Sequence, residues 1–423
     1  METRPPGEFP PDTKIALALC AVGAEKVVSN ELRKLGAAVE ESGFGKVRFR
    51  ADTAGLYRAL MELRAADRVL LETASFHAED FDALFEGTRA VPWEEYVPKG
   101  MGLTVAKVRT NRSRLSAETS VQSVVHKAAA ERLCGAYGTA RLPEPGSGPA
   151  AGVTGAAGIR TPAAELRIYI EKDRVSLLLD LSGEPLFKRG YRIEGGAAPL
   201  RETTAAAILL LSGWRRKFPL YDPFCGSGTI LIEAAMYAWD MAPGLGRRFA
   251  LEDLLIADAD TGGALREELR ERVNFDRIIR IAGSDGDVRA VSIAGSNLER
   301  ALDLALGRVP GRGIRSGPDG GADSAGAALP EIRTLPMGEA RSPWGPEERG
   351  FVIANPPYGK RLGDRAEAER TYGEMRGLLT RFPGWKLAVV TDHPGFESFF
   401  GRKADSCREI TNGAIQSYFY QFY

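Results

Sequence analysis

The second half of this 423-residue chain alternates short apolar runs with segments of helical spacing, and this alternation restricts the fold more than any other feature. Strands are predicted at the apolar runs 219–224, 280–283, 332–336, 351–354, 386–391 and 415–423. Helices are predicted between them at 229–238, 288–300 and 369–381. Strands that alternate with helices favour a mostly parallel sheet with helices on both faces. We therefore expect an α/β domain over residues 201–423, with a Gly-rich insertion at 307–328.

The first half predicts an α+β arrangement instead. Residues 1–76 have the pattern β-α-β-β-α-β, which is the order of a ferredoxin-like unit. Residues 77–182 predict two helices, a strand and a hairpin that turns at Lys172–Asp173, with a flexible insertion at 138–163 rich in Gly, Ala and Pro. Residues 183–200 are expected to link the two halves.

A stiff polar turn follows the apolar run Phe351–Ala354. Pro356 and Pro357 end the strand, because proline lacks the N–H and has a fixed φ. Open α/β sheets bind ligands at such strand ends. The Asn355 side-chain oxygen and the Pro356 carbonyl are hydrogen-bond acceptors, and Tyr358 offers a ring on which a base can stack. Together they suit the exocyclic amino group of a nucleobase, although a plain proline turn after a core strand remains the alternative.

A glycine-rich loop joins the strand at 219–224 to the helix at 229–238. Gly226 and Gly228 allow a tight turn and close approach of a ligand to the start of the helix, where a carboxylate is favoured. The loop has neither the Gly-Lys-Ser/Thr of a phosphate-binding loop nor the G-x-G-x-x-G of a dinucleotide site. Asp222 is a candidate for holding the amino group of an amino-acid-like cofactor. Cys225 has no nearby histidine in sequence, which favours a packed thiol over a nucleophile.

A second acidic turn, G-S-D-G-D at 283–287, follows the next predicted strand. An acid at the end of the second strand is the place where a ribose diol is bound. Asp285 is our first choice for this role and Asp287 the second, since Asp287 has the alternative role of capping the helix at 288–300. Glu339, beyond the strand at 332–336, is a candidate acceptor for an adenine amino group.

Two groups of cations are candidates for binding RNA phosphates. The first is a stretch without acids that contains Lys107, Arg109, Arg112 and Arg114. A solvated loop with surface charges is the alternative. The second lies in the linker, where Lys188, Arg189 and Arg192 are positioned to contact either RNA phosphate or a cofactor carboxylate.

Composition restricts the kinds of partner, metal site and cellular location that the chain can have. The formal net charge is zero, so nucleic-acid binding has to come from local patches. The four cysteines lack C-x-x-C spacing and there are three scattered histidines, so we expect reduced thiols, no metal site and a cytoplasmic location. No apolar run is long enough to span a membrane, and the first residues lack the pattern of a signal peptide.

Three motifs in order resemble class I S-adenosyl-L-methionine (SAM)-dependent methyltransferases of exocyclic amino nitrogens. They are D-P-F-C-G-S-G-T-I-L-I-E-A-A at 222–235, G-S-D-G-D at 283–287 and N-P-P-Y-G-K-R-L-G at 355–363. The stretches L-L-L-D-L-S-G-E-P-L-F-K-R-G-Y-R and A-P-L-R-E-T-T-A-A-A-I-L resemble the THUMP-domain RNA methylases, closest to the bacterial 23S ribosomal RNA guanine-N2 methyltransferases. The resemblance covers nearly the whole chain and implies a C-terminal Rossmann-like class I domain of seven strands. It also implies a ferredoxin-like unit at 1–76 and a THUMP RNA-binding unit at 77–182.

The resemblance also implies roles for particular residues. The amino-nitrogen site corresponds to Asn355, Pro356, Pro357 and Tyr358, and the SAM site to Asp222, Pro223, Cys225, Gly226, Gly228, Asp285 and Glu339. Family members usually have Asp where only Glu339 is available here, and the two insertions are not part of the family pattern. The implied activity is N2 methylation of a guanine in 23S rRNA or in a large-subunit precursor. The chain resembles the family members that have a single methylase domain, and we expect a monomer or weak dimer.

Three alternatives remain open from the sequence. The same chemistry suits a guanine in tRNA, or adenine N6 in RNA or DNA. A non-catalytic RNA-binding assembly factor keeps the fold without turnover. A nucleotide-dependent oxidoreductase is disfavoured by the missing third glycine.

Overall fold

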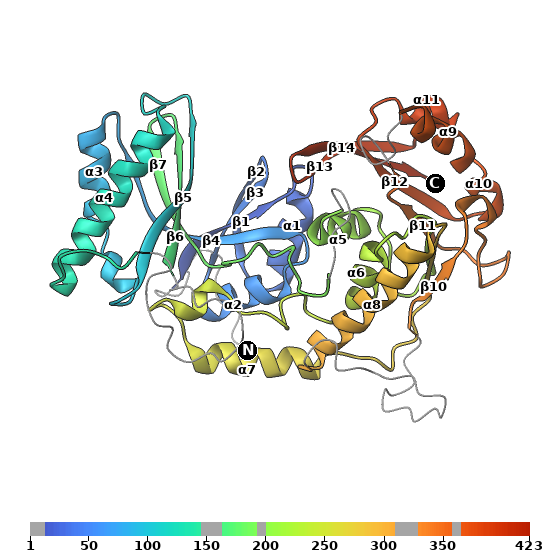
Figure 1. Ribbon diagram of the computed structural model, residues 1–423, viewed down its shortest axis with the longest axis horizontal. Coiled ribbons are helices and arrows are strands. Elements are labelled where there is room, and N and C mark those ends of the chain that lie inside the picture. Colours follow the sequence, from blue (N-terminus) through green and yellow to red (C-terminus); the bar gives the residue numbers. More distant parts are fainter. Residues whose placement is uncertain (1–12, 145–162, 193–199, 309–328, 358–364) are drawn as a thin grey trace, which may run out of the picture.

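The computed structural model describes residues 13–144, 163–192, 200–308, 329–357 and 365–423. Its described strands form two seven-stranded sheets, one in each half of the chain (Figure 1). The first sheet has the order β2-β3-β1-β4-β7-β6-β5 and the second the order β10-β9-β8-β11-β12-β14-β13. The two expected subdomains of the first half therefore share one sheet, because β4 pairs antiparallel with β7.

The first half contains the predicted β-α-β-β-α-β unit followed by a second α+β unit. Its strands are β1 (Lys14–Cys20), β2 (Ala38–Gly43), β3 (Lys46–Ala51), β4 (Ala66–His77), β5 (Gly102–Asn111), β6 (Ala163–Glu171) and β7 (Arg174–Asp180). Its helices are α1 (Glu25–Lys34), α2 (Thr53–Glu62), α3 (Phe81–Arg89) and α4 (Glu118–Tyr137), with a 3₁₀ turn at Trp93–Glu95. The β6–β7 hairpin turns at Lys172 and Asp173, which both have positive φ.

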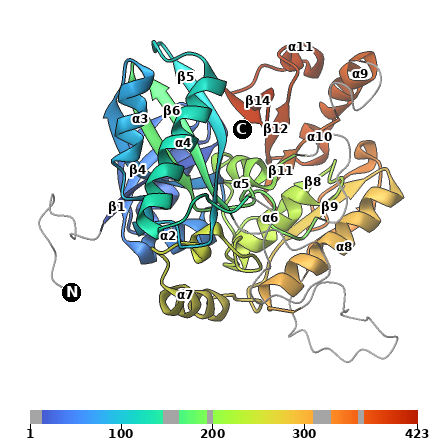
Figure 2. The same cartoon turned by 60° about the vertical axis from the view of Figure 1, so that its left-hand side comes forward.

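One face of the first sheet carries the main core. Side chains at alternate positions, such as Val47 and Phe49 on β3, pack into the same cluster as residues of α1 to α4. In Figure 2 α4 lies across the strands of this sheet. The other face has a small apolar cluster of Leu17, Leu70 and Leu178. The first sheet therefore buries one face under helices and presents a largely polar face opposite.

The second sheet is the predicted mostly parallel one. Parallel pairing joins β10 to β9, β9 to β8, β8 to β11 and β11 to β12, and antiparallel pairing joins β12 to β14 and β14 to β13. The strands are β8 (Leu220–Asp222), β9 (Ile281–Asp285), β10 (Glu331–Thr334), β11 (Phe351–Ala354), β12 (Lys386–Thr391), β13 (Ser406–Asn412) and β14 (Ile415–Phe422). The strands β9 and β10 lie on one side of β8, and β11 and β12 lie on the other, so the strand order reverses at β8. Open α/β sheets bind ligands at such a reversal.

Helices cover both faces of the second sheet, so its central strands are buried on both sides. Ile353 packs into the cluster shared with α5, α6 and α8, whereas its neighbours Val352 and Ala354 pack into a second cluster with α9, α10 and α11. The helices are α5 (Glu202–Leu211), α6 (Thr229–Ala238), α7 (Ala259–Glu271), α8 (Val288–Ala305), α9 (Arg365–Met375), α10 (Leu378–Arg381) and α11 (Phe396–Phe400), with 3₁₀ turns at Ala250–Asp253 and Met337–Glu339. The expected helix at 369–381 is thus two helices, and α7, α11 and β13 were not predicted.

The two halves are joined by close backbone contacts. The turn after β1 hydrogen-bonds with β13, where Thr411 N donates to Val22 O at 3.1 Å and Val22 N donates to Thr411 Oγ1 at 3.0 Å. A Cβ on Gly23, whose φ is +93°, would lie 2.2 Å from Glu409 O, so only glycine fits there. The turn after β1 thereby packs against the outer edge of β13 and joins the two halves.

Candidate active site

The two motif turns that the sequence singled out lie at the same edge of the second sheet. Val352 on β11 pairs with Tyr221 on β8, and Tyr221 pairs in turn with Ala282 on β9, all in parallel. The glycine loop begins after Asp222, the acidic turn after the end of β9, and the proline turn after Ala354. Because the strands are parallel and adjacent, their carboxyl ends bring these three turns together.

Asn355 has a buried acceptor without a partner. It directly follows β11, and its Oδ1 atom is buried and accepts no hydrogen bond. A buried amide oxygen without a donor costs about 1–3 kcal/mol, so it marks a place where a ligand donor is expected. Pro356 is buried and Pro357 half-buried beside it. The fourth residue of the predicted set, Tyr358, lies outside the described residues.

Asp222 is a buried carboxyl group at the end of β8. One of its oxygens accepts the N–H of Phe224 at 3.0 Å. Burial, together with the nearby carboxylate of Asp285, raises its pKa to about 8. A ligand ammonium group placed against Asp222 would reverse this effect, so the site fits the amino group of an amino-acid-like cofactor.

The glycines of the loop have different surroundings. Gly228 has φ +84°, and a Cβ there would lie 3.0 Å from the Cβ of Ala294 on α8. Gly226 has φ +51°, and a Cβ there would meet a single atom within 4 Å, the Phe224 carbonyl oxygen at 4.0 Å. Gly228 is therefore needed for packing against α8, whereas Gly226 leaves space next to the backbone for a ligand.

Both acids of the turn after β9 are engaged, in different ways. Asp285 Oδ2 accepts the N–H of Gly226 at 2.9 Å, and its Oδ1 accepts the N–H of Asp287 at 3.0 Å. Asp287 accepts the N–H of Arg289 at 2.8 Å and caps α8. The helix-capping interpretation of Asp287 is confirmed, and Asp285 is the acid that contacts the glycine loop.

The other predicted cofactor residues lie at the same edge. Pro223 and Cys225 are buried in the loop after β8, and burial raises the pKa of the Cys225 thiol further above its usual range. A thiol held protonated is a poor nucleophile, which favours the packed-thiol interpretation. Glu339 is exposed at the end of the 3₁₀ turn that follows β10.

One residue of the loop's support was not predicted. Asn297 on α8 is fully buried, and its Nδ2 donates to the carbonyl of Ser227 at 3.0 Å. An amide on the apolar face of the predicted helix was the available signal, because a buried amide requires a partner. Asn297 helps to fix the loop that Gly226 and Gly228 form.

The cations of the first half lie on a strand and its turn rather than in a loop. Lys107 and Arg109 are exposed on β5, two residues apart and therefore on one face of the strand. Arg112 is exposed in the turn with φ +51°, and Arg114 forms an ion pair with Glu79. Lys107, Arg109 and Arg112 have no acid partner among the ion pairs of the described residues. These three cations remain candidates for phosphate contacts.

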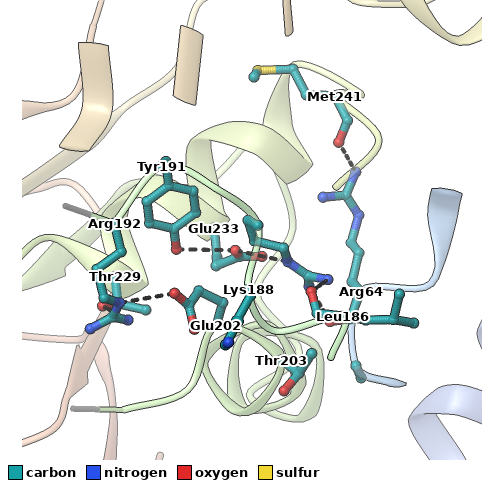
Figure 3. A network of polar contacts seen from close by, with 12 residues as sticks. Arg64, Leu186, Lys188, Tyr191, Arg192, Glu202, Thr203, Thr229, Glu233 and Met241 are labelled. Atoms are coloured by element: carbon teal, nitrogen blue, oxygen red, sulfur yellow. Dashed lines mark hydrogen bonds and ion pairs between the residues drawn. The ribbon is translucent and has the colours of Figure 1, made fainter. Parts of the chain in front are cut away.

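The prediction that Arg189 contacts RNA is wrong, because its side chain is 2% exposed. Its guanidinium donates to Leu186 O at 2.8 Å and to Arg64 O at 2.5 Å, and it pairs with Glu233 Oε1 at 3.4 Å. Figure 3 labels its partners Arg64, Leu186 and Glu233. Lys188 is exposed and forms an ion pair with Glu184. Arg189 therefore joins the two halves, whereas Lys188 stays accessible.

Within the described ranges, no group of three or more His, Cys, Asp or Glu side chains has the arrangement of a metal site. The same ranges contain no helix of the length and apolar character that a bilayer span requires.

Two family models match the chain. The model described as "RMKL-like, methyltransferase domain" matches residues 189–304 and 340–421, and the "RlmL ferredoxin-like domain" matches residues 16–70. The first match contains the glycine loop, the acidic turn and the proline turn. The second falls within the β-α-β-β-α-β unit.

Relatives are similar over nearly the whole chain. "Putative RNA methyltransferase YpsC" of Bacillus subtilis is 34% identical over 96% of this chain and 95% of its own length. "Ribosomal RNA large subunit methyltransferase K/L" of Syntrophotalea carbinolica is 32% identical over 93% of this chain, which spans about half (51%) of that longer protein. Among solved structures, "SMU.472, a putative methyltransferase complexed with SAH" is 33% identical, with a TM-score of 0.78 over 97% of this chain and 98% of its own.

Proposed function

Because this chain belongs to the family of SAM-dependent RNA methyltransferases with an RMKL-like methyltransferase domain and an RlmL ferredoxin-like domain, we propose that it methylates the exocyclic N2 amino group of a guanine in 23S ribosomal RNA. Its cofactor is SAM. The rRNA substrate is supported by the relative of Syntrophotalea carbinolica, about half of whose length this chain spans. We further propose that it acts in the cytoplasm as a monomer or weak dimer.

The observation that carries the choice of an amino nitrogen is the buried, unpartnered Oδ1 of Asn355. An amino group on an aromatic ring is a poor nucleophile, because its lone pair is delocalised into the ring. We infer that Asn355 Oδ1 accepts a hydrogen bond from one N–H of this amino group and the Pro356 carbonyl accepts one from the other. The nitrogen can then pyramidalise and direct its lone pair away from the ring, and positioning supplies most of the rate gain. As the bond from nitrogen to the methyl carbon forms, the bond from that carbon to sulfur breaks, and the nitrogen then releases one proton to water.

The cofactor is held by the turns that follow β8 and β9. In this proposal Asp222 binds its amino group, Gly226 and Gly228 let it approach the backbone, and Asp285 accepts from the ribose. Pro223, Cys225 and Glu339 complete the surroundings, with Glu339 as acceptor for the adenine amino group. When bound, SAM supplies an electrophilic methyl group on sulfur. The chain's own residues orient the attacking nitrogen and exclude water.

RNA binding is proposed for the first half. Lys107, Arg109 and Arg112, which have no acid partner among the ion pairs of the described residues, would contact phosphates, which fixes the orientation of the RNA without reading its sequence. Arg114 of the first half and Lys188 of the linker are exposed but paired with acids, so they are proposed as weaker contacts. The target guanine has to leave its helix, since N2 is not accessible to a cofactor buried at the sheet edge. Tyr358 would then stack on the extruded base.

The test is methyl transfer from labelled SAM to unmodified 23S rRNA, tRNA and DNA, followed by mass spectrometry of the nucleosides. N2-methylguanosine in 23S rRNA is the expected product. Label in tRNA, or on adenine N6, would support methylation of an amino nitrogen but would contradict guanine in 23S rRNA as the substrate. Cofactor binding without turnover on any nucleic acid would favour an assembly factor instead.

A further inference from the structure

The linker contains one cation that turns toward the cofactor loop. Arg192 follows the buried Tyr191, and its side chain is 14% exposed. Figure 3 shows it next to Thr229 at the start of α6 and within hydrogen-bonding reach of Glu202 at the start of α5. Of the three linker cations, Arg189 pairs with Glu233 farther along α6 and Lys188 is exposed, whereas Arg192 contacts Thr229, the first residue of the helix after the glycine loop.

The hydrogen bonds of the Arg192 guanidinium are incomplete. Its Nε donates to Glu202 Oε1 at 2.9 Å, and its Nη2 donates to Leu200 O and to Thr229 Oγ1, both at 3.0 Å. Its Nη1 is buried and has no partner. A guanidinium has five N–H groups in a fixed plane, so the two on Nη1 cannot turn away to reach another acceptor. A buried pair of donors on a charged group requires an oxygen acceptor.

The helix start that Arg192 contacts through Nη2 favours an anion. Thr229 is the first residue of the ten-residue helix α6, and Gly228 before it is the last glycine of the cofactor loop. The first N–H groups of a helix and its dipole favour negative charge at this end. Arg192 therefore adds a directed positive group to a helix start that already belongs to the cofactor site.

We propose that Arg192 binds the carboxylate of the methionyl part of SAM through Nη1. A small ligand that enters the loop brings a carboxylate to this buried position. An RNA phosphate is part of a bulky polymer, and exposed cations such as Lys107 suit it better than a buried Nη1. The proposal requires that SAM is the cofactor, and it holds whichever base is methylated.

The alternative role for Arg192 is structural, since it joins Glu202, Leu200 and Thr229. The two roles are separated by a pair of ligands that differ in the carboxylate alone, SAM and decarboxylated SAM. Their affinities for the full chain are measured by calorimetry without RNA. We expect the wild-type protein to bind the decarboxylated form about 10- to 100-fold more weakly. Arg192→Gln should bind both forms with the same weak affinity, and Arg192→Lys should recover part of the difference.

Each other outcome overturns the proposal. Equal affinity of the wild-type protein for the two ligands would show that the carboxylate has no such partner. An Arg192→Gln variant that weakens both ligands by the same factor would make Arg192 a structural residue, and thermal melting of the ligand-free variant would show the same loss. Unchanged cofactor affinity with weaker RNA binding would make it a phosphate contact. Arg215→Gln, which changes an exposed arginine between α5 and β8, is the matched control and should leave both affinities unchanged.

Discussion

Gly226 donates its backbone N–H to Asp285 Oδ2 across 2.9 Å, so the loop after β8 is tied to the turn after β9. Asp285 holds this turn as well, because its other oxygen accepts the N–H of Asp287. A residue proposed to bind ribose is thus also a support of the glycine loop. The proposed ligand contact and the geometry of the glycine loop therefore depend on the same carboxylate.

Replacing Asp285 should therefore lower cofactor affinity more than replacing Asp287 does. Asp285→Ala removes the acceptor for Gly226 and the proposed ribose contact, and we expect at least about a 10-fold loss of affinity for S-adenosylhomocysteine. Asp287→Ala removes the α8 cap, which should lower the free energy of unfolding by about 1 kcal/mol with little change in affinity. Calorimetry and urea unfolding of both variants check this. A larger loss of affinity in Asp287→Ala would exchange the two roles.

Asn355→Ala should abolish methylation while leaving cofactor affinity near normal. The variant removes an acceptor that the described structure leaves unused, so folding has little to lose. We expect a fall in kcat of about 100-fold or more, the size found when one group that stabilises developing charge is removed. Single-turnover methylation and calorimetry measure the two quantities.

The control for this variant is Asn30→Ala, which removes an exposed amide of α1 and should leave both quantities unchanged. Loss of cofactor binding in Asn355→Ala, with methylation of the bound fraction intact, would put Asn355 in the cofactor site.

The raised pKa of Asp222 predicts how the ligand-free protein responds to pH. The folded-state pKa is about 8 and the usual value is 3.8, so between these values the folded chain binds more protons than the unfolded chain. The free energy of unfolding should therefore fall as pH rises from about 4 to about 8. Asp222→Asn removes this contribution. Urea unfolding of both proteins from pH 5 to pH 9 checks it, and parallel curves would contradict the raised pKa.

Cofactor binding should depend on the same carboxyl group. If the ionised Asp222 binds the cofactor's ammonium group, affinity rises with pH up to about 8 and proton release accompanies binding below it. Calorimetry in buffers of different ionisation enthalpy measures the released proton. An Asp222→Asn variant with the same pH profile would remove Asp222 from the proposed role.

The exposed cations of β5 and its turn should control the salt dependence of RNA binding. Replacing Lys107, Arg109 and Arg112 by Ala should lower the slope of log affinity against log salt by about 2 to 3, because each lost phosphate contact removes nearly one unit. Adding Arg114→Ala should change little, since Arg114 is paired with Glu79. The control variant replaces the exposed Lys26, Arg33 and Lys34 of α1. An unchanged slope would remove this strand from the RNA surface.

Sequence alone determined the type of sheet and the positions of its turns. Short apolar runs and helical spacing are local properties, so the strands from β8 to β12 and the glycine, acidic and proline turns could be located from the residues between 219 and 391. Helix capping by Asp287 followed from local chemistry in the same way. The missed α7 is capped by Asp258, whose side chain accepts two backbone N–H groups, and this capping signal was available in the sequence.

Tertiary structure alone decided which polar groups are buried and what they contact. Arg189 and Arg192 are three residues apart and chemically identical, yet one pairs with Glu233 inside the joint between the halves and the other contacts the start of α6. Strand pairing brought Asn355 to the edge that carries Gly226, and packing left its oxygen without a donor. Such outcomes depend on contacts between residues far apart in the chain, and local patterns carry no information about them.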